Sequence, residues 1–349
     1  MTTQPETRAA AMRRFLAAHG WERAERRPLA GDASFRRYER LSAAGGARAV
    51  LMDAPPPHED VRPFVRLARH LDRLGFSVPT VLAMEEADGF LLLEDLGDET
   101  YTRLLAAGSD EKTLYQRAVD VLIALHRCPP ARAIPPETPL YDRDRLLAEA
   151  GFLPEWHLPA VSGLPMPVSA AARAAYDDAW RNALKTASEL SVPNTLVLRD
   201  FHVDNLMVLE DRPGVRACGL LDFQDAVVAP VTYDLMSLLE DARRDMAPSL
   251  VTALTRHYLD AFPDLDREAF AASWAVLAAQ RHTRVVGVFT RLCVRDGKSA
   301  YLHHIPRVWG LLERACRHPA LAAVAAWFDH HVPSVWRCAP AFPRPGTRP

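Results

Sequence analysis

Three oxygen-bearing side chains follow apolar runs near the middle of the 349-residue chain. Asp200 and Asn205 lie in a short polar loop between two such runs, and Asp222 ends a third run 17 residues after Asn205. The spacing Asp-x4-Asn followed by Asp-Phe is typical of kinase-type phosphoryl transfer. That chemistry needs one carboxylate to orient and deprotonate a hydroxyl, and a carboxylate with an amide oxygen to hold Mg²⁺ against phosphates. We therefore predict Asp200 as the catalytic residue, Asn205 and Asp222 as Mg²⁺ ligands, and ATP as the donor.

The alternative for this stretch is a buried hairpin whose polar loop residues have no function. The runs 206–209 and 218–221 are predicted to pair, with a turn at 211–214 closing them. An Asp-x4-Asn spacing without a second carboxylate would not distinguish a functional site from this alternative. A second carboxylate at the end of its own strand, in Asp222-Phe-Gln, favours the phosphoryl-transfer site.

The loop Leu198-Arg-Asp-Phe-His-Val-Asp-Asn205 resembles the His-Gly-Asp-Leu-His-Pro-x-Asn loop of the aminoglycoside phosphotransferase/choline kinase family. Within that family, three other stretches resemble the anomeric kinases of N-acetylmuramate and N-acetylglucosamine from bacterial cell-wall recycling. They are Gly31–Tyr38, Met52–Pro56, and Gln280–Arg284 continuing through Arg295–Lys298. The resemblance covers roughly residues 10–335 and implies a protein-kinase-like fold and ATP-dependent phosphorylation of a small hydroxyl acceptor.

The expected fold is α+β with two lobes. Strands at 25–30, 35–42 and 48–53, a helix at 59–74 and a hairpin of 78–84 with 90–93 suit the small antiparallel-sheet lobe of a kinase fold. We place a nucleotide-binding lobe at residues 1–95 and a catalytic, acceptor-binding lobe at 96–349. The second lobe is predicted to be mostly helical, with a Pro-rich irregular insertion at 135–167.

The nucleotide is expected to meet a turn of small residues, including Gly31 and Ser34, and the connecting segment that starts at Glu94. Small residues let a backbone approach a phosphate, although they also make ordinary hairpin turns. No lysine precedes Lys112, and the position of the usual phosphate-gripping lysine resembles Met52.

Arginine must then neutralise phosphate charge in the first lobe. Arg36 and Arg37, directly after the small-residue turn, are the candidates, since arginine binds phosphate bidentately. Exposed strand arginines are the alternative for either one. The sequence also departs from the family at Leu198, where the first His of the loop would stand, and at Gln224, where Asp-Phe-Gly has its glycine.

The acceptor is expected to meet a helix at 270–295. Arg281 and Arg284 belong to one helical stripe of arginines, which is either a solvated face or the acceptor site. Residues 250–349 carry 13 Lys/Arg and 7 Asp/Glu, a formal charge of +6. This charge disfavours a polycationic aminoglycoside and suits an anionic or neutral acceptor; N-acetylmuramate carries a lactyl carboxylate.

Three further residues are candidates for substrate contact. His202 in the catalytic loop suits a bracing hydrogen bond better than proton transfer. Asp225 could touch metal or substrate, or serve a structural role. Trp156 could stack on a sugar face or fill the core.

The bulk composition excludes several classes of protein. A net charge of −2 gives no nucleic-acid or membrane signature, and no apolar run approaches the roughly 18 residues of a membrane span. Five scattered cysteines have no disulfide or metal spacing. We expect a cytoplasmic monomer whose partner is a small-molecule amino sugar.

Together these features predict a kinase of the anomeric hydroxyl of N-acetylmuramate or N-acetylglucosamine in peptidoglycan recycling. One rival is a phosphotransferase for aminoglycosides or another small alcohol. The other, suggested by the missing lysine, is a non-catalytic nucleotide-binding regulator.

Overall fold

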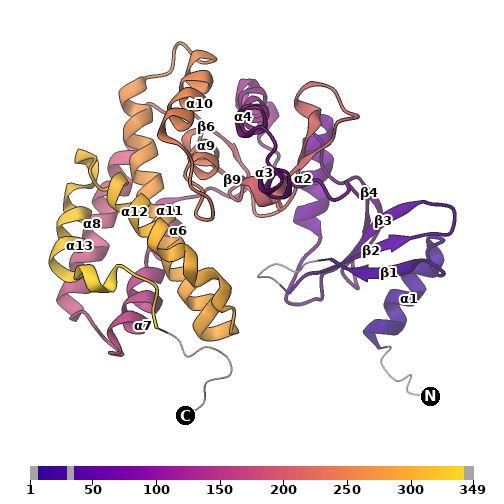
Figure 1. The fold of residues 1–349 in the computed structure, drawn as a ribbon, viewed down its shortest axis with the longest axis horizontal. Helices are drawn as coiled ribbons and strands as arrows, with labels where there is room; N and C mark the ends of the chain where they lie inside the picture. The colour runs from indigo at the N-terminus through magenta and orange to yellow at the C-terminus, as the bar shows by residue number, and fades with distance from the viewer. Residues whose placement is uncertain (1–6, 30–34, 342–349) are drawn as a thin grey trace. The chain divides into compact units, whose positions relative to one another are not determined.

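The computed structural model describes residues 7–29 and 35–341, which fall into two compact units (Figure 1). The first unit comprises Met1–Leu125 and Val203–Asp225, and the second comprises His126–His202 and Ala226–Pro349. The chain therefore passes between the units inside the loop of Asp200 and Asn205. The predicted lobes, 1–95 and 96–349, follow the chain in order and stay a prediction.

The first unit is built on an antiparallel sheet in the order β1-β2-β3-β5-β4. Its strands are β1 (Glu25–Pro28), β2 (Arg37–Ser42), β3 (Arg48–Asp53), β4 (Val81–Glu85) and β5 (Phe90–Leu93). The helices described in this unit are α1 (Arg8–Ala18), α2 (Arg62–Arg73), α3 (Tyr101–Ala106) and α4 (Glu111–Arg127), whose last turn enters the second unit. The sheet confirms the small-lobe strand order read from the sequence.

The two faces of this sheet have different partners. Phe15 and Leu16 of α1 form a core with Leu41, Leu51 and Leu92 on one face. Because side chains alternate along a strand, the neighbouring positions turn to the opposite face. That opposite face lines the pocket described below.

A second hairpin in this unit carries the metal-type residues. It consists of β7 (Leu206–Val208) and β8 (Cys218–Leu220), as the sequence predicts. Ser77 fixes β8, since its carbonyl accepts the Leu220 N–H at 2.8 Å. The Glu99 carbonyl accepts the Val208 N–H at the same distance, so the segment after β5 is tied to β7.

The second unit is mostly helical, with one small two-stranded sheet of β6 (Asn194–Val197) and β9 (Val227–Pro230) among its described residues. Its helices are α5 (Pro130–Ala133), α6 (Arg143–Ala150), α7 (Leu158–Ser162), α8 (Ala170–Glu189), α9 (Thr232–Leu239), α10 (Pro248–Asp260), α11 (Arg267–Asp296), α12 (Ile305–Ala315) and α13 (Ala322–His331). The expected irregular insertion at 135–167 is wrong, because α6, a π-helix at Leu153–His157 and α7 occupy most of it. Pro154 and Pro159 stand in the first turns of the π-helix and of α7, where a missing N–H costs little.

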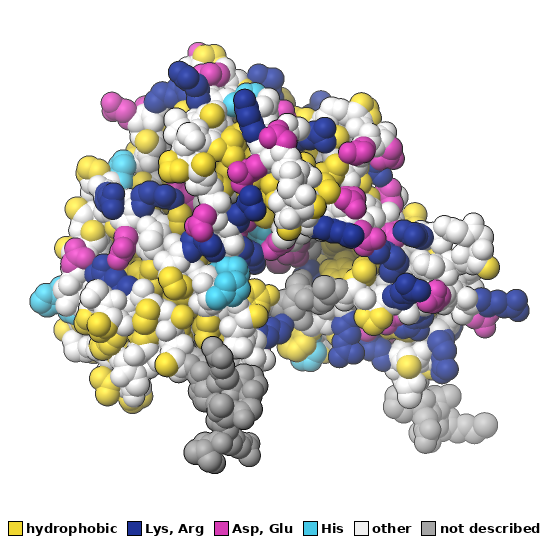
Figure 2. Space-filling view, viewed as in Figure 1, with side chains coloured by type: hydrophobic (Ala, Val, Ile, Leu, Met, Phe, Trp, Pro, Cys, Tyr) yellow, Lys and Arg dark blue, Asp and Glu magenta, His cyan; other side chains and the backbone are white. Residues whose placement is uncertain are grey.

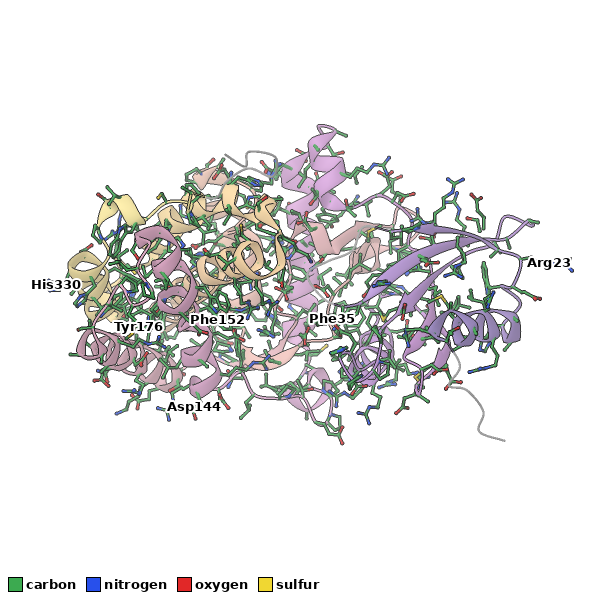
Figure 3. All side chains as sticks on the ribbon, turned by 90° about the horizontal axis from the view of Figure 1, so that it is seen from below. Arg23, Phe35, Asp144, Phe152, Tyr176 and His330 are labelled. Carbon is green, nitrogen blue, oxygen red and sulfur yellow. The ribbon has the colours of Figure 1, made fainter. Side chains whose placement is uncertain are left out.

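Helix α11 is the centre of the helical unit. Asp266 caps its start by accepting two backbone N–H groups, and Gly297 ends it in the left-handed conformation. Apolar residues of α11 pack with α8, α9, α12 and α13 around Tyr176 and Trp180. Figure 3 shows Phe152 and Tyr176 within this helical unit.

Charged side chains of both signs are interspersed among apolar ones on the face shown in Figure 2. No helix within the described residues is long and apolar enough to cross a membrane.

Close packing at Gly287 of α11 generates a stability prediction. A Cβ at this position would lie 2.4 Å from the backbone carbon of Phe152. Gly287→Ala should therefore lower the free energy of unfolding by about 1–3 kcal/mol. Urea denaturation followed by circular dichroism measures this change.

Gly310 in α12 supplies the matched control, because a Cβ there meets nothing within 4 Å. Gly310→Ala should be neutral or raise stability by up to about 1 kcal/mol, from helix propensity alone. Equal effects of the two substitutions would contradict the packing argument.

Candidate active site

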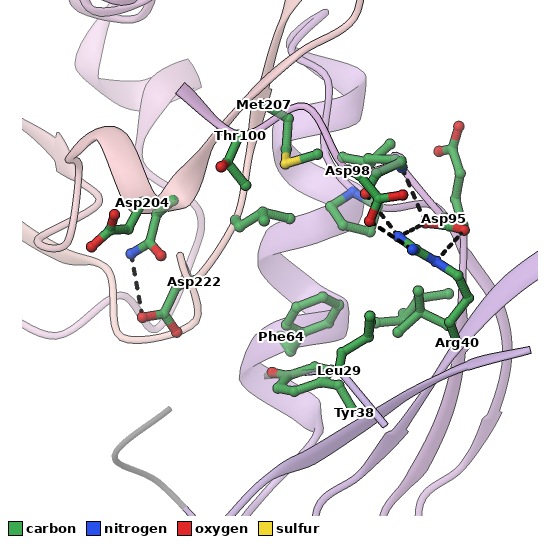
Figure 4. Close-up of a pocket in the computed structure, with 18 residues that line it drawn as sticks. Leu29, Tyr38, Arg40, Phe64, Asp95, Asp98, Thr100, Asp204, Met207 and Asp222 are labelled. Carbon is green, nitrogen blue, oxygen red and sulfur yellow. Dashed lines mark hydrogen bonds and ion pairs between the residues drawn. The ribbon is translucent and has the colours of Figure 1, made fainter. Parts of the chain in front are cut away.

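A pocket of about 380 Å³ opens on the sheet face of the first unit (Figure 4). Its apolar walls come from β2, β3 and β5, from α2 and from the β7–β8 hairpin. The apolar lining residues are Leu29, Tyr38, Val50, Phe64, Pro79, Leu93, Leu96, Met207 and Leu221. The pocket has the size and the mixed lining that a small planar ligand with a polar end requires.

The segment after β5 forms one wall of this pocket and is held by Arg40 of β2. The Arg40 guanidinium lies 2.8 Å from Asp95 and 2.7 Å from Asp98, and it donates to the Gly97 carbonyl at 2.9 Å. Glu94 also lines the pocket, but its carboxylate accepts from the Thr80 hydroxyl at 2.8 Å and pairs with Arg212. The Glu94 side chain thus stabilises the wall, and its predicted nucleotide contact stays a prediction.

Asp222 and Asn205 meet at the opposite end of the pocket. The Asn205 amide nitrogen lies 3.5 Å from an Asp222 carboxylate oxygen (Figure 4). The strand β8 and the turn before β7 deliver the two side chains, as the apolar runs predicted. A cation would bind the Asn205 amide oxygen, while the amide nitrogen faces the Asp222 carboxylate.

These two residues suit Mg²⁺ in chemistry and in number. Both offer hard oxygen ligands, and Mg²⁺ in nucleotide sites takes few protein ligands because phosphates and water supply the rest. No group of three or more His, Cys, Asp or Glu residues arranged for a metal occurs within the described residues, so a dedicated protein cage is not seen there.

Arg36 approaches Asp222, whereas Arg37 does not. The Arg36 guanidinium lies 3.9 Å from an Asp222 oxygen and 2.9 Å from Glu59, which precedes α2. The Arg37 side chain is exposed at the start of β2. The structure therefore places one of the two candidate arginines beside the metal-type residues. Gly31 and Ser34 lie outside the described residues.

Asp200 belongs to the second unit, where Arg281 of α11 lies 3.7 Å from its carboxylate. Burial opposes ionisation, but the charges of Arg281 and Arg284 outweigh it and lower the pKa of Asp200 to about 2. Arg281 is itself fixed by donating to the Arg199 carbonyl at 3.0 Å and to the Tyr233 hydroxyl at 3.2 Å. Asp200 is thus an ionised carboxylate at neutral pH.

Glu149 of α6 forms ion pairs with two further arginines near Asp200. Its carboxylate lies 2.9 Å from Arg199 and 3.1 Å from Arg284, and it accepts from the Tyr141 hydroxyl. Arg281 is buried, and the Arg284 side chain is only 19% exposed. The arginine stripe of α11 is therefore not a solvated face at these two positions, although Arg295 at its end is exposed.

The backbone before Asp200 is held by Asp234 of α9. Its carboxylate accepts the Leu198 N–H at 2.6 Å and the Arg199 N–H at 3.0 Å. Burial raises the pKa of Asp234 to about 7, although both N–H groups favour its ionised form. Arg199 has a φ of 69°, the left-handed conformation that favours glycine. The family loop described above has its glycine at this position.

The three other residues predicted to contact the substrate lie in different surroundings. His202 is buried, and burial followed by the charge of Arg243 lowers its pKa, so a neutral bracing role is favoured over proton transfer. Asp225 accepts from the Gln224 amide at 3.3 Å in the first unit. Trp156 is half-buried on the π-helix that packs on α11. Sugar or substrate contact by any of these stays a prediction.

Sequence reasoning missed three partners that organise the site: Glu59, Glu149 and Arg40. Each acts through a long-range ion pair, and no local spacing marks such a pair. One signal for these contacts was present in the sequence: an arginine stands at position 199, where the family loop has glycine. A large charged side chain in place of that glycine indicates a specific partner, which is Glu149.

A pocket with an Asp–Asn pair at its end, on a sheet of this order, is the arrangement expected of a phosphotransferase. A family model described as "Phosphotransferase enzyme family" matches residues 25–271 of the chain. The chain belongs to this phosphotransferase enzyme family.

Relatives of known activity agree with that assignment. The chain is 38% identical to an N-acetylmuramate/N-acetylglucosamine kinase of Caulobacter vibrioides, over 95% of this chain and 99% of the relative. It is 39% identical to a kinase of the same description from Pseudomonas aeruginosa, over 88% and 90% of the two chains.

Solved structures share the fold at low sequence identity. A choline/ethanolamine kinase family protein from Mesorhizobium loti has a TM-score of 0.60 at 14% identity, covering 92% of this chain and 99% of that one. A GDP complex of aminoglycoside 2'-phosphotransferase-IIIa has a TM-score of 0.60 at 12% identity, covering 89% and 98%. These structures show the α+β, protein-kinase-like fold.

The ion pair between Arg281 and Asp200 generates a pH prediction. Asp200 is the predicted base, and a base is active when ionised, so activity should fall as pH drops through its pKa. With a pKa near 2, Asp200 gives no acid limb in the working range. Arg281→Gln removes the nearby charge, so it should raise the pKa of Asp200 and produce an acid limb at the low-pH end of the kcat/KM profile, where the parent protein has none.

Arg181→Gln is the control, since Arg181 lies on α8 and its ion-pair partner is the exposed Asp178. The control should keep the profile of the parent protein. If Arg281→Gln shows no acid limb at low pH, with the fold intact by circular dichroism, the result would argue against this role for the arginine.

Proposed function

We propose that the protein is an ATP-dependent kinase that phosphorylates the anomeric hydroxyl of N-acetylmuramate, N-acetylglucosamine or both, to give the sugar 1-phosphate. The observation that carries the proposal is the match, at 34–39% identity over at least 83% of this chain, to four kinases of that description. The site chemistry of both units supports it.

The pocket of the first unit would hold the nucleotide. Its apolar walls suit a planar base, and the segment Glu94–Asp98 offers backbone polar groups at the rim. Asn205 and Asp222 would hold the Mg²⁺ ion, which neutralises phosphate charge when bound. Arg36 would add a cation beside Asp222, in a sequence that has no lysine before Lys112.

Asp200 would act on the acceptor. It accepts the proton of the sugar hydroxyl as that oxygen bonds to the γ-phosphorus, and the bond from the γ-phosphorus to the β–γ bridging oxygen breaks to release ADP. An anomeric hydroxyl is more acidic than an ordinary alcohol, so a carboxylate with a low pKa is a sufficient base. Arg281 keeps this carboxylate ionised.

The charge around Asp200 supports an anionic or neutral acceptor. Arg199, Arg281 and Arg284 surround it, and Glu149 compensates only part of their charge. A polycationic aminoglycoside would be repelled from such a cluster, whereas a sugar carrying a carboxylate would be attracted. We propose Arg281 and Arg284 as the residues that set this preference.

A panel of acceptors tests the proposal. Incubation with ATP and Mg²⁺ should release ADP with N-acetylmuramate or N-acetylglucosamine, and phosphorus NMR should place the phosphate on the anomeric oxygen. Kanamycin should give no turnover. Product with kanamycin alone, or phosphate at another hydroxyl, would contradict the proposal.

Asp200→Asn separates this kinase from a non-catalytic nucleotide-binding regulator. The substitution keeps the side-chain shape and removes the base, so turnover should fall by about 10³-fold while ATP binding persists. No turnover by the parent protein with any sugar would favour the regulator.

Arg36 and Arg37 form a matched pair for the phosphate contact. Arg36→Met should lower kcat/KM for ATP by about tenfold to a hundredfold, because a charge-assisted contact near the phosphates is lost. Arg37→Met should change it by less than about twofold, since its side chain is exposed. Steady-state kinetics with varied ATP measures both, and equal losses would reject the assignment of Arg36.

A further inference from the structure

Gln224 has a contact that a glycine at its position could not make. Its side chain is buried, and its amide nitrogen donates to an Asp222 oxygen at 2.7 Å and to Asp225 at 3.3 Å. Exchanging the amide oxygen and nitrogen would turn an acceptor toward two carboxylates, so the hydrogen bonds fix the orientation of the amide. One carboxylate oxygen of Asp222 therefore accepts a hydrogen bond from Gln224.

The backbone around Gln224 is also fixed. Asp222 has a φ of 56°, which is uncommon outside glycine. Phe223 is fully buried and stacks on Phe64 of α2, with ring centroids 5.0 Å apart. Phe223 is thus held by packing and Gln224 by hydrogen bonds, and the Gln224 amide limits the rotation of the Asp222 carboxylate.

The amide oxygen of Gln224 has no such partner. It is buried and accepts no hydrogen bond from any residue within 7–29 and 35–341. A buried acceptor without a donor costs about 1–3 kcal/mol, so natural sequences retain one where something else supplies the donor. The Asp222 carboxylate, which we propose as a metal ligand, is two residues away along the chain.

We propose that Gln224 is a positioning residue for the metal site. Its amide nitrogen orients the Asp222 carboxylate toward the cation, and its amide oxygen accepts a hydrogen bond from a water of the cation's hydration shell. Mg²⁺ keeps several waters when it binds a nucleotide site, and each such water is a donor. This inference rests on the proposed role of Asp222 as a metal ligand.

The proposal predicts an effect on cation affinity rather than on the acceptor. Residues that orient a metal ligand change metal affinity by about 10–100-fold when they are substituted. Methionine fills a similar volume to glutamine but cannot make these hydrogen bonds. Gln224→Met should therefore lower the affinity of the protein for the cation by about tenfold or more. The KM for the sugar should stay within about twofold of the parent value.

The measurement uses Mn²⁺ as a spectroscopic probe. Mn²⁺ is titrated into the protein with the non-hydrolysable analogue AMP-PNP, free Mn²⁺ is followed by electron paramagnetic resonance, and binding by AMP-PNP alone is subtracted. Thermal unfolding of each variant is recorded in parallel. Gln116→Met, the same change at an exposed position of α4, should match the parent protein.

The outcomes separate this inference from the function on which it rests. Asp222→Asn should abolish the added Mn²⁺ affinity; if it does not, the proposed metal site itself is wrong. If Asp222→Asn loses affinity and Gln224→Met keeps it within about twofold, Gln224 has no positioning role. Gln224→Ala is the second variant, and failure of both variants to fold would assign the residue to folding and overturn the proposal.

Discussion

Arginine compensates the carboxylates of Asp200, Glu149 and Glu59, and the candidate site depends on that compensation. An uncompensated charge in such a position costs several kcal/mol, so each carboxylate needs a cation or several donors. Asp200 has Arg281, and Glu149 has Arg199 and Arg284. Because a guanidinium has five donors in a plane, one arginine can pair with a carboxylate and also bind a carbonyl or hydroxyl. The ion pairs therefore also position the backbone of the loop.

The elements around the site could be predicted well where local pattern decides them. The strands at 48–53 and 90–93 have the predicted bounds, since turn residues flank alternating or wholly apolar runs. The small-lobe strand order and the β7–β8 hairpin also follow from the sequence, as does the approach of Asn205 to Asp222. The region at 135–167 could not be predicted from its prolines, because proline in a first helical turn looks the same as proline in a loop.

The charge network could not be predicted, and the reason is physical. Glu59 pairs with Arg36 across 23 residues, and Glu149 pairs with Arg199 across 50. Periodicity reports neighbours on one helix or strand, whereas these pairs depend on tertiary packing. The α11 stripe illustrates this limit, since spacing placed its arginines on one face without showing which were buried. The nucleotide, metal and acceptor contacts stay predictions for the same reason.

The interactions that restrain residues 222–224 affect how the activity of such an enzyme could be regulated. Many kinases are silenced when the equivalent segment flips and withdraws its aspartate, and a glycine gives that hinge its freedom. Here the aromatic stack of Phe223 and the amide of Gln224 would both have to break before Asp222 could leave. Withdrawing Asp222 would therefore cost more free energy here than in a chain with glycine at position 224, which disfavours an on–off switch at this point.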